Sequence, residues 1–180
     1  MWEAKLSDIM DYCPTAIVTG SVNHEMTTHF IQLLNNIKNH ETGRDDDPLV
    51  IFFGTPGGCV SDARHCVQII KEMQKTRPVM IIGISAVMSA GVELMLAAKY
   101  RAILDDCEVM IHNPSLESGD DRETSLSLSN KSVRLEVDYV DKLKLKLSKK
   151  QRELVKYDHD LVIENVQDLI KIGLVNTEII

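Results

Sequence analysis

The chain has 180 residues, of which 44% are hydrophobic and 26% charged, and its formal net charge is −7. This composition excludes a disordered chain, a collagen-like fibre and a small disulfide-stapled domain. The negative charge disfavours nucleic acid as a partner, because phosphate backbones repel an acidic surface. No run of residues approaches the roughly 20 apolar positions of a membrane-spanning helix.

The four cysteines are typical of reduced thiols in the cytoplasm, because Cys13, Cys59, Cys66 and Cys107 form no CxxC pair. No further thiol or histidine completes a tetrahedral metal site with them, so we expect no metal ion. The sequence therefore predicts a single cytoplasmic domain over residues 1–180.

Short apolar runs predict strands, and longer periodic segments predict the helices between them. Strands are expected at residues 16–19, 49–53, 79–84, 101–104 and 109–111. Helices are expected from residue 26, from Cys59 or Ser61, over 89–98, from a Ser148 cap to Tyr157, and over 164–172 with an end at Gly173. This alternation is typical of βαβ units, so the fold class is α/β with a mostly parallel sheet.

One apolar stripe in the second half predicts a long helix. Val133, Val137, Val140, Leu143 and Leu147 recur at helical spacing, and the preceding residues 124–129 alternate like a strand. The stripe indicates either an interface between subunits or packing within one subunit.

Three segments that contain candidate catalytic groups follow predicted strands. Active sites of parallel sheets lie at the carboxyl ends of the strands. Gly54–Gly58 is a glycine-rich turn that can present backbone amides to a substrate. Gly83–Gly91 carries Ser89 at the head of a helix, where a serine is either an N-cap or a nucleophile. Ser85 is a rival within the same segment, and Val109–Pro114 carries the third candidate, His112.

Together these segments supply a hydroxyl, an imidazole and backbone donors, as an acyl-transfer site requires. A carboxylate is also needed to orient the imidazole. Asp158 and Asp160 are both candidates, and the local sequence does not choose between them.

Several of these motifs resemble the ClpP family, the proteolytic subunits of the ATP-dependent Clp proteases. Thr55–Gly58 (TPGG) resembles the family's SPGG turn, Ala86–Gly91 (AVMSAG) its AASMG nucleophile segment, and Met110–Pro114 (MIHNP) its MIHQP segment. The stretch from Lys156 onward resembles the family's closing helix and YGL(I/V)D phrase. The resemblance runs from about Thr15 to Ile180.

The resemblance implies a ClpP/crotonase-type fold and a serine endopeptidase. It aligns Ser89 with the nucleophile, His112 with the base and Asp160 with the orienting acid. It implies an oxyanion hole at Gly58 and Ala90, with Gly57 shaping the turn, and a protruding helical handle at about residues 113–147.

The resemblance also implies a homo-oligomer of two stacked heptameric rings that receives unfolded proteins from an AAA+ Clp unfoldase. All ATP chemistry would belong to that partner, since this chain has no P-loop and is expected to hold no cofactor.

The chain departs from the family pattern at several positions, as a divergent, viral or accessory paralogue would. Ala90 replaces a methionine, His159 replaces an arginine, and residues 115–122 lack the glycine-rich handle strand. The alternatives are therefore a non-catalytic subunit that assembles with another ClpP, and an acyl-CoA enzyme of the crotonase type.

Overall fold

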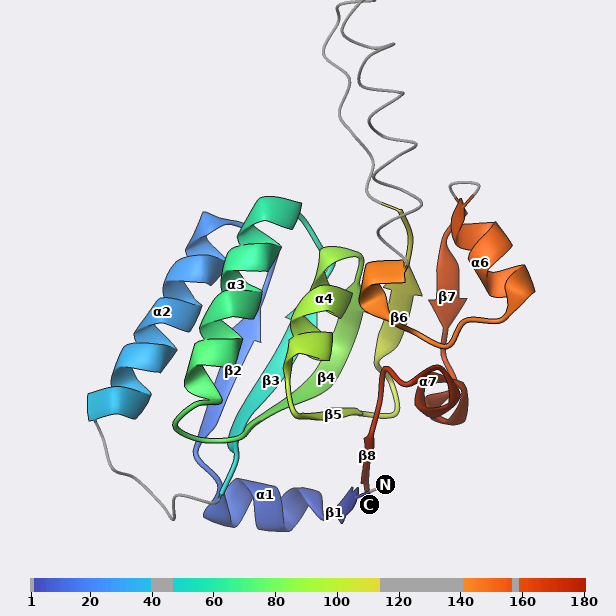
Figure 1. Ribbon diagram of the computed structural model, residues 1–180. Helices are drawn as coiled ribbons and strands as arrows, with labels where there is room; N and C mark the ends of the chain where they lie inside the picture. The colour runs from blue at the N-terminus through green and yellow to red at the C-terminus, as the bar shows by residue number, and fades with distance from the viewer. Residues whose placement is uncertain (1, 40–46, 114–140, 157–158) are drawn as a thin grey trace, which may run out of the picture.

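The computed structural model describes residues 2–39, 47–113, 141–156 and 159–180 (Figure 1). In chain order the elements are β1 (Trp2–Ala4), α1 (Leu6–Tyr12), β2 (Thr15–Thr19), α2 (His24–Asn39), β3 (Leu49–Thr55), α3 (Val60–Met73), β4 (Val79–Met88), α4 (Ala90–Ala97), β5 (Tyr100–Ile103), β6 (Glu108–Ile111), α6 (Lys149–Lys156), β7 (Leu161–Ile163), α7 (Val166–Ile172) and β8 (Thr177–Ile179). None of the described helices is long and apolar enough to cross a membrane.

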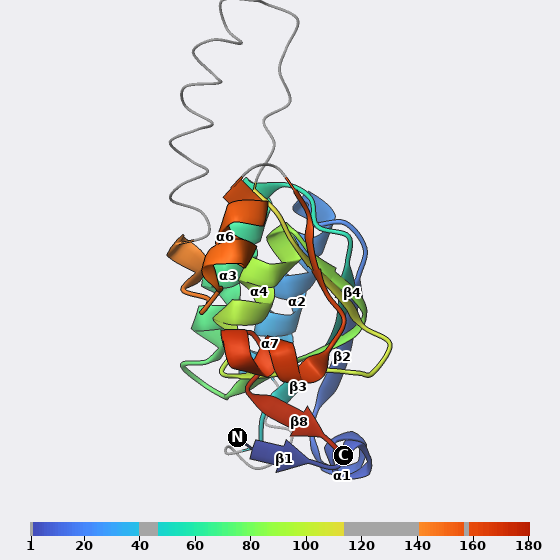
Figure 2. The ribbon, with the colours of Figure 1, turned by 90° about the vertical axis from the view of Figure 1, so that its right-hand side faces the viewer.

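The larger sheet has the strand order β2-β3-β4-β6-β7, and β5 pairs with the first half of β4. All of these pairings are parallel except that of β6 with β7. The sheet is therefore mostly parallel, as predicted. β1 and β8 form a separate parallel pair, which brings the two ends of the chain side by side (Figure 2).

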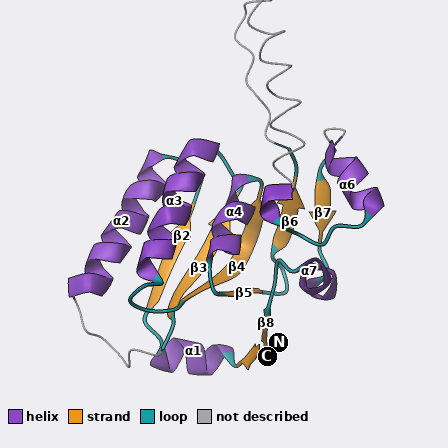
Figure 3. Ribbon diagram, viewed as in Figure 1, coloured by secondary structure: helices purple, strands orange, loops and turns teal. Residues whose placement is uncertain are grey.

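Helices α2, α3 and α4 lie together over one face of the larger sheet (Figure 3). Successive side chains of a strand point to opposite faces, and the central strands follow this rule closely. In β3, Ile51 and Phe53 belong to the main core, whereas Val50 belongs to a smaller cluster with Ile9 of α1. The sheet therefore packs on both faces, which explains the unbroken apolar runs of its central strands.

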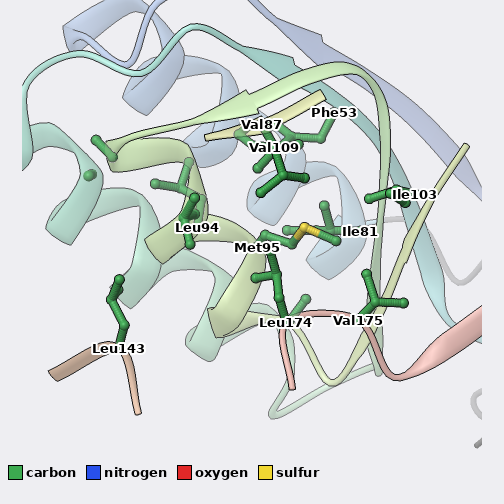
Figure 4. Close-up of a cluster of buried hydrophobic side chains, with 14 of the residues drawn as sticks. Phe53, Ile81, Val87, Leu94, Met95, Ile103, Val109, Leu143, Leu174 and Val175 are labelled. Atoms are coloured by element: carbon green, nitrogen blue, oxygen red, sulfur yellow. The ribbon is translucent and has the colours of Figure 1, made fainter. Parts of the chain in front are cut away.

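The main core continues from the sheet into the C-terminal part of the chain. Met95 of α4 lies near Ile81 of β4, and Leu174, which follows α7, joins the same buried cluster (Figure 4). This packing fixes α4, whose first residue follows Ser89, against the sheet.

The strands and helices predicted between residues 16 and 111 and between residues 148 and 172 are present, with some shifted ends. β4 runs to Met88, four residues further than expected, and Ser148 caps α6 as predicted. Ser148 Oγ accepts from Gln151 N–H at 3.3 Å, and Gln151 Oε1 accepts from Ser148 N–H at 2.9 Å, which is a capping box. The short elements β1, α1, β7 and β8 were not expected from the sequence.

The long helix predicted through Leu147 is wrong at its C-terminal end. Residues 141–143 are helical, but Lys144 has a φ of 54° and ends the helix there. Leu145 and Leu147 then alternate with exposed residues, as an extended chain against the core does. The rest of the predicted handle, residues 114–140, lies outside the described residues.

Candidate active site

Ser89 occupies the junction between β4 and α4, at the carboxyl end of a central strand. Its backbone angles, φ 51° and ψ −121°, are unfavourable for a residue with a side chain. Two backbone bonds hold this turn: Ser89 N–H donates to the Met110 carbonyl at 2.9 Å, and the Ser89 carbonyl accepts from Val92 N–H at 3.0 Å. The strained turn is thus fixed by both β6 and α4.

The side chain of Ser89 does not cap α4, although the residue stands at the N-cap position. Its Oγ lies instead 2.7 Å from Nε2 of His112. A hydroxyl at this distance from an imidazole is the arrangement that activates a serine nucleophile. Ser85, the rival candidate, lies within β4, where its Oγ packs against Gly54.

Strand pairing brings Asp160 to the other side of the His112 ring. Ile111 of β6 is directly opposite Leu161 of β7 in an antiparallel pair, so the residues just beyond them, His112 and Asp160, also face each other. Asp160 Oδ1 lies 3.3 Å from His112 Nδ1. This register favours Asp160 over Asp158, which lies outside the described residues.

The contacts of His112 are consistent with one tautomer. With its proton on Nδ1, the ring presents that nitrogen to the Asp160 carboxylate and leaves Nε2 to accept the Ser89 hydroxyl proton. The three side chains are therefore in contact in the order carboxylate, imidazole and hydroxyl, which is the order that a Ser-His-Asp triad requires.

The glycine turn lies directly against Ser89. Gly57 has a φ of 93°, and a Cβ atom built on it would be only 2.7 Å from Ser89 Cβ. Val22 clamps the turn from the other side, because its N–H donates to the Gly57 carbonyl and its carbonyl accepts from Cys59 N–H, both at 2.8 Å. Only a glycine fits at position 57 without moving the serine.

The local backbone pattern of this turn supplies no acceptor for two amides, those of Gly58 and Ala90. Val22 forms a parallel bridge with Gly58, a pattern that directs the Gly58 N–H away from Val22. The Ala90 N–H is in the first turn of α4, where no intrahelical acceptor exists. The Gly57 N–H, in contrast, already donates to Thr55 Oγ1 at 3.1 Å, so Gly57 shapes the turn rather than donating to a ligand.

Sequence reasoning missed three residues that support this arrangement: Thr55, Val22 and Asn113. Thr55 holds the Gly57 amide, and Val22 comes from the loop after β2. Asn113 is buried and donates from Nδ2 to the Val155 carbonyl at 2.9 Å. No local sequence pattern indicates a role for Val22. Thr55 and Asn113 lie inside the TPGG and MIHNP motifs, so their place next to candidate site residues could have indicated a supporting role.

Buried cysteines do not compete with Ser89 as nucleophiles. Burial raises the pKa of the Cys107 thiol to about 11, and burial also raises the pKa of Cys66. Both thiols are therefore held in the protonated, unreactive form. Among the residues that the structure describes, no three His, Cys, Asp or Glu side chains gather as metal ligands do.

The family model for Clp protease matches residues 6–179. The chain belongs to the Clp protease family. A variant of ClpP1 from Listeria monocytogenes has a similar structure, with a TM-score of 0.67 and 25% sequence identity over 92% of this chain and 90% of that one. No curated protein matches the chain. The family and the shared fold identify the chain as a ClpP-type protein and confirm the predicted fold class.

Proposed function

We propose that this chain is a serine endopeptidase in which Ser89 is the nucleophile, His112 the general base and Asp160 the orienting carboxylate. The observation that carries the proposal is the 2.7 Å contact of Ser89 Oγ with the His112 nitrogen that faces away from Asp160. Membership of a protease family supports the same conclusion.

The reaction proceeds in two halves. Ser89 Oγ attacks the peptide carbonyl carbon while its proton passes to His112 Nε2, and the Asp160 carboxylate stabilises the imidazolium. When the C–N bond breaks, His112 returns the proton to the leaving amine. A water molecule, deprotonated by His112, then attacks the acyl-enzyme and releases Ser89 with its proton restored.

The negative charge that forms on the carbonyl oxygen would be stabilised by the amides of Gly58 and Ala90. Removal of one such donor in a serine protease costs about 3–4 kcal/mol of transition-state stabilisation. The clamp of Val22 and Thr55 on the glycine turn supports this role, because it holds the turn in place before substrate binds.

The particle that we propose is the ClpP assembly of two stacked heptameric rings, with an AAA+ unfoldase that delivers unfolded proteins. Family membership supports this assembly, and the proposed chemistry requires no cofactor in this chain. The partner ATPase would supply all of the energy for unfolding.

Hydrolysis of a short fluorogenic peptide tests the site without the unfoldase, because short peptides enter the particle unaided. We compare wild type, Ser89→Ala and the matched control Ser85→Ala, with native mass spectrometry to follow assembly. Ser89→Ala should lower kcat by at least about 10³-fold with assembly intact. Ser85→Ala should retain turnover, because its hydroxyl packs against Gly54 and not against His112.

Two outcomes would contradict the proposal. Equal turnover by wild type and Ser89→Ala would exclude Ser89 as the nucleophile. An assembled wild type without turnover would favour the accessory-subunit alternative, and mixing it with an active ClpP would test that alternative directly.

A further inference from the structure

The pair formed by His112 and Asp160 lies just beyond the end of the β6–β7 ladder, whose register sets the two residues opposite each other. The β6–β7 ladder contains three residue pairs and ends at Ile111 and Leu161, so both side chains lie beyond its last pair. The Asp160 side chain is 60% exposed. Ion pairs and hydrogen bonds this open to water contribute little to holding their own geometry. The backbone on either side must therefore place the two groups.

Asn113, the residue immediately after His112, anchors the backbone there to another element. Its side chain is buried, with 4% of the residue exposed, and Nδ2 donates to the carbonyl of Val155 at 2.9 Å. Val155 is in the last turn of α6, where carbonyls have no intrahelical donor. The bond therefore links the residue that follows His112 to the C-terminal end of α6.

The same end of α6 leads to Asp160. His159 N–H donates to the Leu154 carbonyl at 3.1 Å, which closes the chain against the helix just before Asp160. We infer that Asn113 is a positioning residue that holds His112 at the correct distance from Asp160 by tying both flanks to α6. This inference rests on the proposed function, because it assigns Asn113 a role through those two groups.

The second polar atom of Asn113 favours a role beyond stability. Its Oδ1 is buried and has no hydrogen-bond partner among the residues that the structure describes, which opposes folding. A leucine of similar shape would remove this unpaired carbonyl and leave the Val155 carbonyl unpaired instead. Because the two penalties roughly offset each other, Asn113→Leu is expected to change the melting temperature by only a few degrees.

Peptide hydrolysis by Asn113→Leu tests the inference. We expect kcat to fall about 10- to 100-fold while KM changes by less than about twofold, because substrate contacts are retained and proton transfer is misaligned. Rates are expressed per site labelled to completion by a fluorophosphonate, so that a misfolded fraction does not lower them. Asn113→Ser, which is too short to reach Val155, should give the same result if the leucine variant folds poorly.

A double-mutant cycle separates positioning from a general structural effect. In an Asp160→Ala background, Asn113→Leu should lower kcat by less than about threefold, because the contact that it maintains is already absent. The matched control is Asn176→Leu. Asn176 also links distant segments, since Nδ2 donates to the Lys99 carbonyl and Oδ1 accepts from Arg101 N–H, but it lies away from the triad. This control should lower the melting temperature and leave kcat per labelled site unchanged.

The possible results are distinct. If wild type shows no Ser89-dependent turnover, the proposed function fails and this inference fails with it. If wild type is active and Asn113→Leu has the same kcat, or loses the same factor in the Asp160→Ala background, the inference alone is overturned. Selective loss of kcat that disappears in that background supports it.

Discussion

At the scale of single residues, Gly57 is the glycine that packs directly against the side chain of Ser89. A side chain there would meet both the Cβ and the Oγ of Ser89, at 2.7 Å and 3.3 Å. We predict that Gly57→Ala lowers kcat by more than about 100-fold, because the serine or the turn must move away from its partner groups. Steady-state peptide hydrolysis measures the effect.

The control for this prediction is Gly20→Ala. Gly20 has a similarly positive φ of 108°, but a Cβ atom there meets nothing within 4 Å. Its substitution should cost about 1 kcal/mol of stability through backbone strain and leave kcat unchanged. If both alanine variants lose activity equally, strain in the loops and not contact with Ser89 is responsible.

The sequence predicted the candidate residues better than their relation to one another. Ser89 and His112 stand out because each follows an apolar strand, but local sequence does not distinguish a capping serine from a nucleophile. That distinction depends on the 2.7 Å contact between side chains from different elements. The choice of Asp160 over Asp158 likewise follows from the register of β6 and β7, which is a property of the folded sheet.

At the scale of elements, long segments were predictable and short ones were not. β3 and β4 are continuous apolar runs, and α3 has clear helical periodicity. β7 has only three residues, flanked by Asp160 and Glu164, which is too short for a periodicity signal. Such a strand forms because Leu161 and Ile163 are buried by partners elsewhere in the chain, and sequence windows do not contain that information.

Helix α4 carries a half-buried carboxylate, Glu93, in the turn that follows Ser89. Burial raises the pKa of Glu93 above its ordinary value of 4.5, and the nearby charges of Arg64 and Lys142 offset this effect only in part. The folded state therefore binds the Glu93 proton more readily than the unfolded chain does. Stability from this group is present below pH 4.5 and is lost as the pH rises through the pKa of the folded protein.

Glu93→Gln should therefore stabilise the protein at neutral pH, because the uncharged amide avoids the desolvation of the carboxylate. We predict a melting temperature about 1–3 °C higher than wild type at about pH 8, and a difference that vanishes near about pH 4. Thermal unfolding at both values measures this. Glu153→Gln, an exposed change on α6, is the control and should show no such pH-dependent gain. A loss of stability at about pH 8 would instead mean that attraction to Arg64 and Lys142 outweighs burial.

At the scale of the whole molecule, Arg101 connects the α/β body to the C-terminal segment. Its side chain donates to the carbonyls of Ala98, Gly173 and Leu174 at 2.9, 3.3 and 2.7 Å. Its backbone N–H donates to Asn176 Oδ1 at 2.8 Å. The bonds to Gly173, Leu174 and Asn176 join residues more than seventy positions apart, so their loss weakens the attachment of α7 and β8 without touching the triad.

Arg101→Met tests this division between stability and chemistry. The substitution leaves the three carbonyls without their donor, and hydrogen bonds to charged groups contribute about 1.5–3 kcal/mol each when the site is partly buried. We predict a loss of about 2–4 kcal/mol in the free energy of unfolding, measured by urea denaturation, with kcat per labelled site unchanged. Lys75→Met, which removes an exposed ion pair with Glu72, should change stability by less than about 1 kcal/mol. A fall in kcat for Arg101→Met at full occupancy of the folded state would mean that the C-terminal segment also controls the alignment of Asp160, so that stability and chemistry are not separate.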